Sequence, residues 1–390
     1  MTRRTAATSL AAMAGLGVRA ATAAEGEAAP TGPIKVPTGP GLLFREGPPG
    51  WWDSERCSCP RVLRGADGVW RMWYYGRDPD FDDSYILPTG RIGLATSSDG
   101  IAWQRVRGPL TMGAVLEPSA DETRFDSGHV GVGGVSHDND QYVMWYFGGD
   151  RSLRPVGPGG RGGGRGFPLR PGRATSPDGI TWTRDDGPYR GAFLDVGAAG
   201  EFDAVMVGWP HLLKEDDGSY KLYYHTLSPA EGFMACAAAS ADGRTWEKIG
   251  PVLKKGPEGN FDQAGVASRH VSKVNGRYVM FYEGNDGRWF GGIGMAESAD
   301  GITFTRVKGP DRGGSMLASP PRDGDRFDSH GIGTPWLVPM EDGSFRLYYV
   351  GATSRIKGDL ESGESRNIHR IGLALSDGMD LTKWRRWDGA

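Results

Sequence analysis

Aspartates recur in one sequence context at five places. Each follows an aromatic residue and precedes a short extended segment: Asp53, Asp126, Asp203, Asp262 and Asp328. Carboxylates that lie together can act as a general base and its orienting partner, and Asp126 and Asp203 are our candidates for these roles. The other interpretation is architectural, because a residue found in every repeat can accept backbone N–H bonds in its turn and fix the start of the next strand.

Glu283 has no counterpart in the other repeats. It directly follows an aromatic run, Tyr278–Tyr282, and the corresponding positions elsewhere hold Gly76, Phe147 or Gly148, His225, and Val350 or Gly351. A carboxyl group that its surroundings keep protonated can donate a proton to a leaving group. Glu283 is therefore our candidate proton donor, and a solvated or ion-paired glutamate is the alternative.

Histidines and tryptophans gather near the same segments. Four of the seven histidines lie at or near the starts of the segments that follow the aspartates: His129, His211, His270 and His330. With Arg269 they could bind ligand hydroxyl groups or a metal, and ordinary hydrogen-bonded histidines are the alternative. No further ligand pattern accompanies them, so we predict no metal and no cofactor. Trp209 could stack on a ligand ring or pack between repeats.

Two further motifs predict the elements that position these residues. The first, Ser-x-Asp-Gly-x-x-aromatic, indicates a hairpin turn, and its copies are Ser97–Trp103, Ser176–Trp182, Ser240–Trp246, Ser298–Phe304 and a degenerate Ser376–Trp384. The second is an aromatic run whose alternation at period two predicts a strand. Its copies are Trp70–Tyr75, Tyr142–Tyr146, Tyr220–Tyr224, Tyr278–Tyr282 and Phe345–Tyr349.

Together the motifs predict an all-β fold. Each repeat contains four strands, A to D, with A after the aromatic-Asp pair and D after the Asp-Gly turn. Five such units predict a five-bladed β-propeller of four-stranded antiparallel blades in one domain, residues 41–390. Leu42-Leu43 is similar to the apolar pair ahead of each internal aspartate, so we expect the N-terminal segment to close the ring. The D-to-A and B-to-C connections share one end of the propeller, which is the predicted site.

These motifs resemble those of a known superfamily. The Asp and Pro that introduce the innermost strand, the "Y-x-M-W-Y" run and "I-G-L-A-x-S-x-D-G-x-x-W" resemble the five-bladed propellers of arabinanase, levansucrase and invertase, which include glycoside hydrolase families 32, 43, 68 and 130. In families 32, 43 and 68 the resemblance implies three carboxylates at the channel mouth. The chain departs from that pattern, since Cys59, Trp209 and Thr334 directly precede the innermost-strand prolines and Arg269 precedes His270.

The resemblance implies a glycosidase-like, carbohydrate-active protein. We expect it to hydrolyse or transfer a glycosyl unit with paired carboxylates at the channel mouth, drawn from Asp126, Asp203 and Glu283. The alternative is a non-catalytic propeller that binds a glycan or a protein partner through the same face. The residues expected to bind the substrate are Asp53, His129, Trp209, Asp262, Arg269, His270, Asp328 and His330.

Composition excludes several other classes. The chain has 45 Lys and Arg against 48 Asp and Glu, a net charge of −3, so no strong field attracts nucleic acid or an anionic membrane. No apolar run is long enough to span a membrane. The three cysteines predict packed thiols, because their odd number and spacing fit no disulfide framework. We expect a monomer with a carbohydrate ligand.

The first thirty residues have the features of a targeting segment. No acidic residue occurs before Glu25, Arg3-Arg4 precede a mildly apolar stretch, and Ala21-Thr22-Ala23 is a small-residue cleavage pattern. These features predict an exported protein, periplasmic or secreted, with a twin-arginine-like signal, or a plastid or thylakoid-lumen protein. A disordered Ala-rich terminus without targeting function is the alternative. Residues 31–40 are expected to be a linker.

Overall fold

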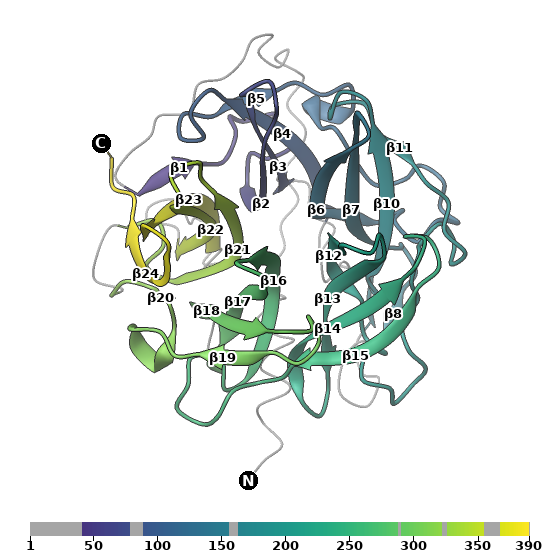
Figure 1. The fold of residues 1–390 in the computed structure, drawn as a ribbon. Helices are drawn as coiled ribbons and strands as arrows, with labels where there is room; N and C mark the ends of the chain where they lie inside the picture. Colours follow the sequence, from purple (N-terminus) through teal and green to yellow (C-terminus); the bar gives the residue numbers. More distant parts are fainter. Residues whose placement is uncertain are drawn as a thin grey trace.

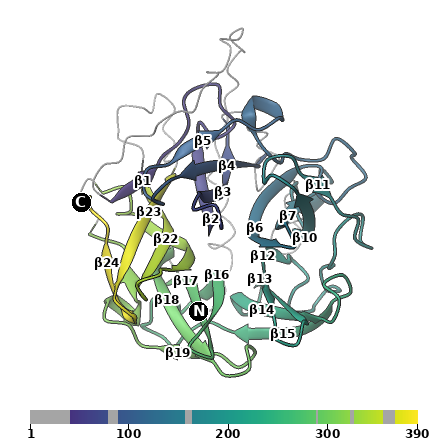
Figure 2. The same ribbon diagram turned by 45° about the horizontal axis from the view of Figure 1, so that its top comes forward.

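The chain folds into β-strands arranged around a central axis. The computed structural model describes residues 41–78, 89–155, 163–287, 290–321, 326–354 and 367–389. The strands form blades that stand side by side in a ring, in the order of the sequence (Figure 1), and the turned view shows the same ring (Figure 2). A parallel bridge between Phe233 and Gly265 joins two neighbouring blades into one sheet. The predicted all-β, five-bladed propeller is confirmed. The predicted targeting segment 1–30 and linker 31–40 lie outside the described residues.

Each blade has four antiparallel strands, and the first of them lies nearest the axis. Blade 1 contains β2 (Arg56–Arg64), β3 (Trp70–Arg77), β4 (Arg91–Ser97) and β5 (Gln104–Val106). Blade 2 contains β6 (His129–Asp138), β7 (Gln141–Gly149), β10 (Arg170–Ser176) and β11 (Thr183–Arg184). Blade 3 contains β12 (Gly208–Lys214), β13 (Tyr220–Ser228), β14 (Gly232–Ser240) and β15 (Glu247–Leu253). Blade 4 contains β16 (Gly265–Val274), β17 (Arg277–Asn285), β18 (Phe290–Ser298) and β19 (Thr305–Val307). Blade 5 contains β21 (Gly331–Pro339), β22 (Phe345–Ser354), β23 (Asn367–Asp377) and β24 (Asp380–Arg386).

Short segments connect the blades. The N-terminal strand β1 (Leu42–Phe44) pairs antiparallel with β23 of blade 5. This pairing is the contact that ring closure by the N-terminal segment requires, and the closure itself stays a prediction. In the same way β20 (Leu317–Ala318) pairs with β18 of blade 4. The remaining short elements are β8 (Arg154–Pro155), β9 (Gly163–Gly164) and the 3-10 turns Thr111–Gly113 and Arg312–Gly314.

The turns after the third strands of blades 1 to 4 owe their shape to the Ser-x-Asp-Gly motif. In blade 1 the Ser97 Oγ accepts a hydrogen bond from the Gly100 N–H at 3.0 Å. The Asp99 Oδ1 accepts hydrogen bonds from the Ile101 N–H at 2.7 Å and from the Ala102 N–H at 2.8 Å. The glycine has a φ of +73°, in the left-handed region that favours glycine. Equivalent Ser and Asp bonds recur at Asp178, Asp242 and Asp300.

The five repeated aspartates lie inside the blades. The Tyr74 hydroxyl donates to the Asp53 Oδ2 at 2.9 Å, and the Arg105 Nε donates to the same oxygen at 2.8 Å. Every blade repeats this arrangement, with a tyrosine from the second strand and a basic residue from the fourth. The other sets are Asp126 with Tyr146 and Arg184, Asp203 with Tyr224 and Lys248, Asp262 with Tyr282 and Arg306, and Asp328 with Tyr349 and Arg386.

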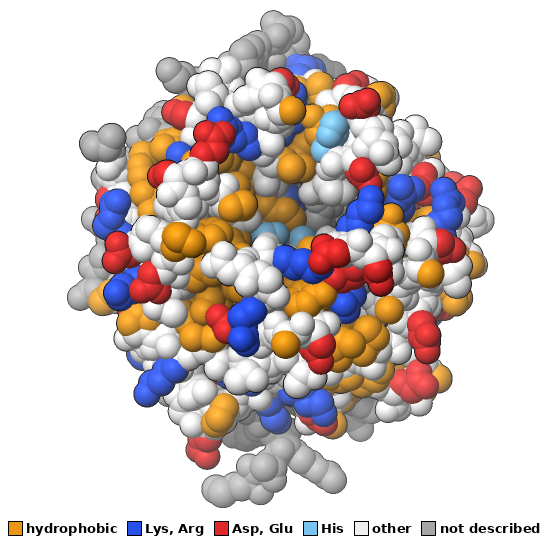
Figure 3. All heavy atoms as spheres, in the orientation of Figure 1, with side chains coloured by type: hydrophobic (Ala, Val, Ile, Leu, Met, Phe, Trp, Pro, Cys, Tyr) orange, Lys and Arg blue, Asp and Glu red, His pale blue; other side chains and the backbone are white. Residues whose placement is uncertain are grey.

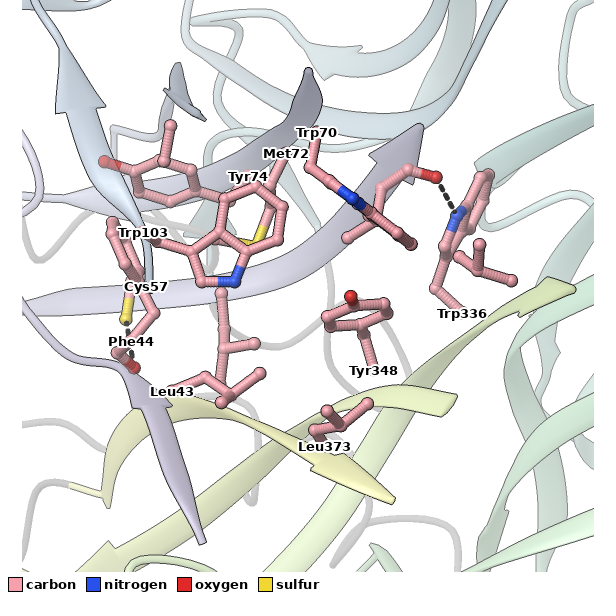
Figure 4. Close-up of a cluster of buried hydrophobic side chains, with 14 of the residues drawn as sticks. Leu43, Phe44, Cys57, Trp70, Met72, Tyr74, Trp103, Trp336, Tyr348 and Leu373 are labelled. Carbon is pink, nitrogen blue, oxygen red and sulfur yellow. Dashed lines mark hydrogen bonds between the residues drawn. The ribbon is translucent and has the colours of Figure 1, made fainter. Parts of the chain in front are cut away.

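Aromatic side chains fill the spaces between blades. Figure 4 shows the cluster between blades 5 and 1, where Leu43 and Phe44 of β1 pack against Tyr74 and Trp103 of blade 1 and Leu373 of blade 5. All five are buried. Burial of a large apolar side chain contributes roughly 1.5–3 kcal/mol. These clusters hold neighbouring blades together, whereas the aspartate contacts hold each blade together internally.

The buried ion pair of blade 1 predicts a large loss of stability in Asp53→Asn. The change leaves the Arg105 guanidinium buried without an anionic partner, since the two side chains are 0% and 1% exposed. Breaking such a pair costs roughly 3–5 kcal/mol. Urea unfolding of the variant measures this loss in the free energy of unfolding.

The matched control is Asp67→Asn, which breaks the exposed pair between Asp67 and Arg71. We expect that variant to lose far less stability, because water screens an exposed ion pair. Equal losses in the two variants would contradict the structural role of the buried aspartate.

Candidate functional site

One side chain in each blade stands directly after the repeated tyrosine, so it points to the opposite face of the blade. These five residues are Tyr75, Phe147, His225, Glu283 and Val350. In blades 1 to 4 this side chain contacts the innermost strand of the next blade. The Tyr75 ring lies 5.6 Å from the His129 ring, and the Phe147 ring stacks on Trp209 at 4.2 Å. The repeated scaffold thus presents five equivalent positions, and the chemistry differs at each.

The innermost strands are irregular where these side chains arrive. The pairing of each with its second strand shifts register at one place. In three blades the residue before the proline has a positive φ: 53° at Cys59, 50° at Trp209 and 46° at Thr334. Non-glycine residues in this region cost on the order of 1–3 kcal/mol, and such strain clusters at functional sites. The chain therefore holds three strained residues around its central channel.

Glu283 is a buried carboxyl group at this channel. It extends from β17 of blade 4, and its Oε2 accepts a hydrogen bond from the Thr334 N–H of blade 5 at 2.7 Å. Burial raises its pKa to about 7, against the smaller lowering effects of that hydrogen bond and of the Arg61 charge. A carboxyl group with this pKa carries a proton for much of its time at neutral pH, as a general acid must.

Trp209 lies between two rings at the channel. Its indole stacks on Phe147 of blade 2 at 4.2 Å and on His225 of its own blade at 4.6 Å. Its Nε1–H donates to the Cys59 Sγ of blade 1 at 3.3 Å. Three blades therefore fix Trp209 in one orientation. Because protein rings stack on its indole, these contacts favour the packing interpretation, and stacking on a ligand ring stays a prediction.

Cross-blade hydrogen bonds hold the innermost strands together. The Trp336 Nε1–H donates to the Val62 carbonyl at 2.8 Å, which links blade 5 to blade 1. The Arg61 Nε donates to the Gly133 carbonyl of blade 2. The His211 Nε2 lies 2.9 Å from the Val271 carbonyl and links blades 3 and 4. Figure 3 shows the centre of the ring hollowed on the face in view, with histidine side chains at its floor.

Two residues predicted to bind substrate contribute to this framework. Arg269 is 1% exposed, and its guanidinium donates to the Trp209 and Tyr223 carbonyls and contacts the His225 Nδ1 at 3.1 Å. The His270 Nδ1 accepts from the Leu337 N–H at 3.1 Å. Burial lowers the pKa of His270 well below its ordinary value. These contacts give both residues structural roles, and binding of substrate by them stays a prediction.

Two other predicted histidines lie nearer the ends of the strands. His129 starts β6, between the rings of Tyr75 and Phe147. The His330 Nδ1 lies 3.1 Å from the Ser329 Oγ just ahead of β21. His129 thus belongs to the group at the channel, and His330 lies at the start of the innermost strand of blade 5.

The predicted aspartates occupy one equivalent position in every blade. Asp126 and Asp203, the candidate base and orienting carboxylate, are both fully buried, as are the predicted substrate-binding Asp53, Asp262 and Asp328. Their tyrosine and basic partners lie within the blade. The contacts therefore favour the architectural interpretation of all five, and a catalytic role for Asp126 or Asp203 stays a prediction.

Neither a metal site nor a membrane helix is found in the described ranges. Within them, no group of three or more His, Cys, Asp or Glu side chains is placed to hold a metal ion. They also contain no helix with the length and apolar character that crossing a membrane requires. The three cysteines are buried free thiols.

Sequence reasoning did not single out two residues at the site. Tyr75 stands at the same distance from its repeated tyrosine as Glu283, and Arg61 lies two residues after Cys59. The offset from the repeated tyrosine was a signal in the sequence that could have found Tyr75. Arg61 had no such signal, because its contacts with Gly133 and Trp336 come from other blades.

Solved structures of carbohydrate-active enzymes share this fold. A GH130 structure, from work on mannoside phosphorylases and hydrolases that target β-1,2 mannosidic linkages in Candida mannan, is 19% identical with a TM-score of 0.60 and covers 92% of this chain and 96% of its own. A glycosyl hydrolase from Bacteroides ovatus is 18% identical with a TM-score of 0.58, covering 86% and 88%. An N-acetylgalactosamine deacetylase from F. plautii is 16% identical with a TM-score of 0.59, covering 88% and 97%.

These likenesses identify the fold as that of the five-bladed β-propeller glycoside hydrolases. Structures from families GH43 and GH32 also match the chain, so the predicted resemblance to this superfamily is confirmed in fold. No protein-family model and no curated protein sequence matches the chain. At identities this low the likeness shows the fold alone, and the deacetylase shows that one fold serves more than one reaction.

The raised pKa of Glu283 predicts a pH dependence of stability. The folded state binds the proton more tightly than the unfolded state, whose carboxyl group has a pKa near 4.5. The free energy of unfolding should therefore fall as the pH rises from about 4.5 to about 7, by up to about 1.4 kcal/mol per pH unit from this group. Urea unfolding of Glu283→Gln across this range should lack this fall.

Glu297→Gln provides the comparison. Glu297 lies on the adjacent strand β18 at the opposite end of the blade, since it pairs with Val279. That variant should keep the wild-type slope. A Glu283→Gln protein with the same pH dependence as wild type would show that the carboxyl group is ionised in the folded state.

Proposed function

We propose that the chain is a carbohydrate-active enzyme that cleaves or transfers a glycosyl unit at the channel mouth, with Glu283 as the proton donor. The observation that carries this proposal is the buried Glu283 carboxyl group, whose pKa is raised to about 7. Its hydrogen bond to Thr334 fixes it at a strained position of the neighbouring blade. A leaving sugar oxygen needs a proton from such a group.

The architecture does not require an acid at this position. The other four blades hold Tyr75, Phe147, His225 and Val350 there, and each folds without a carboxyl group. A buried carboxyl group is costly when it ionises, so an isolated one is retained more readily for chemistry than for stability.

The second carboxylate of the predicted pair would be Asp126 or Asp203. Either one would have to act while bound by its partners, the Tyr146 hydroxyl and Arg184 for Asp126, and Lys248 for Asp203. Support for the pair is therefore weaker than support for the proton donor. The proposal assigns Glu283 first and the base second.

A non-catalytic glycan-binding propeller is the second candidate. The observation that favours it lies on the innermost strands, where the positions directly before the prolines hold Cys59, Trp209 and Thr334 rather than carboxylates. A propeller without carboxylates at these positions can bind a sugar without cleaving it.

A screen for hydrolysis and phosphorolysis separates the two functions. The full chain is tested against aryl glycosides and oligosaccharides, beside Glu283→Gln and the control Glu297→Gln. Loss of the general acid should lower kcat by about 10²–10⁴-fold, while Glu297→Gln keeps wild-type turnover.

Two results would count against the enzyme. An active Glu283→Gln protein would remove Glu283 as the proton donor. Silence across the panel, with oligosaccharides still raising the melting temperature, would favour the binding propeller.

A further inference from the structure

Four arginines of the described residues are buried, and only one has a carboxylate partner. The four are Arg61, Arg77, Arg105 and Arg269. Arg105 pairs with Asp53 inside blade 1. The other three make no ion pair with a carboxylate of the described residues, although buried charges are ordinarily paired.

Two of these three arginines donate their hydrogen bonds to backbone carbonyl groups. Arg61 donates to the Gly133 and Pro60 carbonyls, and Arg269 donates to the Trp209 and Tyr223 carbonyls. These bonds satisfy hydrogen-bonding groups but leave the positive charge in place. Glu283, the carboxyl group whose charge acts on Arg61, has a pKa of about 7 and so cancels only part of this charge at neutral pH. The described residues therefore place more positive than negative charge around Arg61 and Arg269.

Arg77 is different, because no backbone carbonyl of the described residues accepts from its guanidinium. It is 9% exposed and lies at the end of β3, two residues after Tyr75 and on the same face of the strand. Its Nε donates to the Tyr75 hydroxyl, and its guanidinium carbon lies 5.2 Å from the centre of that ring. The neighbouring carboxylate, Asp78, pairs with Arg91 instead.

The fold itself does not call for an arginine at this position. The corresponding residues of the other blades are Gly149, Leu227, Asn285 and Ala352. None of them carries a charge, and the blades around them have the same four strands. Arg77 is thus a departure from the repeat at the end of the blade where Glu283 also departs from it.

Neutral hydrogen-bonding groups stand beside Arg77. The His369 Nδ1 of blade 5 lies 3.4 Å from the Ser58 Oγ of blade 1. Burial, followed by the charges of Arg56 and Arg77, lowers the pKa of His369 well below its ordinary value. His369 is therefore neutral at pH 7, with one ring N–H that can donate.

We propose that Arg77, with the Tyr75 hydroxyl, forms a subsite for an oxyanion of the ligand at the channel mouth, and that His369 and Ser58 border it. The planar guanidinium matches a carboxylate or a phosphate group. The anion has two sources, the carboxylate of an acidic sugar and free inorganic phosphate. The claim that the bound anion belongs to a substrate rests on the proposed function. The claim that an anion binds at Arg77 does not depend on that function.

The test measures binding of three probes to the full chain by calorimetry. Galacturonate and inorganic phosphate carry the anion, and galactose is the neutral comparison. At least one anion should bind more tightly than galactose, and added sodium chloride should weaken that binding. Galacturonate as the tight probe identifies a sugar carboxylate, and phosphate as the tight probe identifies a free inorganic anion.

Arg77→Gln should weaken the binding of the tight anion by about tenfold or more. The matched control is Arg71→Gln, on the same strand at the other end of the blade, where Arg71 pairs with the exposed Asp67. It should leave affinity within about twofold. If Arg77→Gln does not fold, Arg77→Lys keeps the charge but loses the planar fork, and it should bind the anion several-fold more weakly.

Two results overturn the subsite: neither anion binding better than galactose, or an Arg77 variant binding the anion as tightly as wild type. The outcomes for the proposed function are separate. Anion binding that depends on Arg77, without turnover of any glycoside, would support the subsite and contradict the proposed enzymatic function. Turnover that depends on Glu283, without anion binding, would contradict the subsite and support the proposed enzymatic function.

Discussion

A buried carboxylate in each blade is the interaction on which the rest of this structure depends. It accepts bonds from a tyrosine of the second strand and a basic side chain of the fourth, just ahead of the first strand. Three parts of a blade are thus tied to one point near the channel end. Such a contact tolerates little change, since removal of one partner leaves a buried charge without compensation. Its repetition in five blades places the side chain after each tyrosine at an equivalent position in the ring.

The candidate functional side chains stand at positions where the blades differ from one another. The side chains after the tyrosines are a phenol, a phenyl ring, an imidazole, a carboxyl group and a valine. Each blade supplies a fixed frame, and the neighbouring blade supplies the contact, as Thr334 does for Glu283. Two of the three αL residues before the prolines are themselves such contacts, since Trp209 stacks on Phe147 and the Thr334 N–H donates to Glu283.

The described charged groups near the channel are more positive than negative. Among the described residues, Arg61, Arg77 and Arg269 are buried without a carboxylate ion pair, and the charge of Arg61 acts on Glu283, whose own ionisation is suppressed by burial. In a medium of low polarity these effects reinforce each other over short distances. A neutral proton donor beside excess positive charge suits a ligand that brings a negative charge and a leaving oxygen to the same place.

The sequence predicted the architecture because its information is local and repeated. The Ser-x-Asp-Gly turns, the alternating aromatic runs and the aromatic-Asp pairs each act within a few residues, so five copies were enough to predict the strands, their order and the blade count. Glu283 was recognisable by the same comparison, as the carboxyl group in a position that other repeats fill differently.

The tertiary structure determined the contacts that these side chains make, many of them between blades. The sequence left the repeated aspartates open between architecture and catalysis, and the bonds to Tyr146 and Arg184 favour architecture for Asp126. It assigned Arg269 and His270 to the ligand, and the structure surrounds both with partners from other strands. Neither Arg61 nor Arg77 stood out. The physical reason is that burial, pKa and the lack of a counter-charge depend on residues far apart in the chain, and these meet only when the blades pack into a ring.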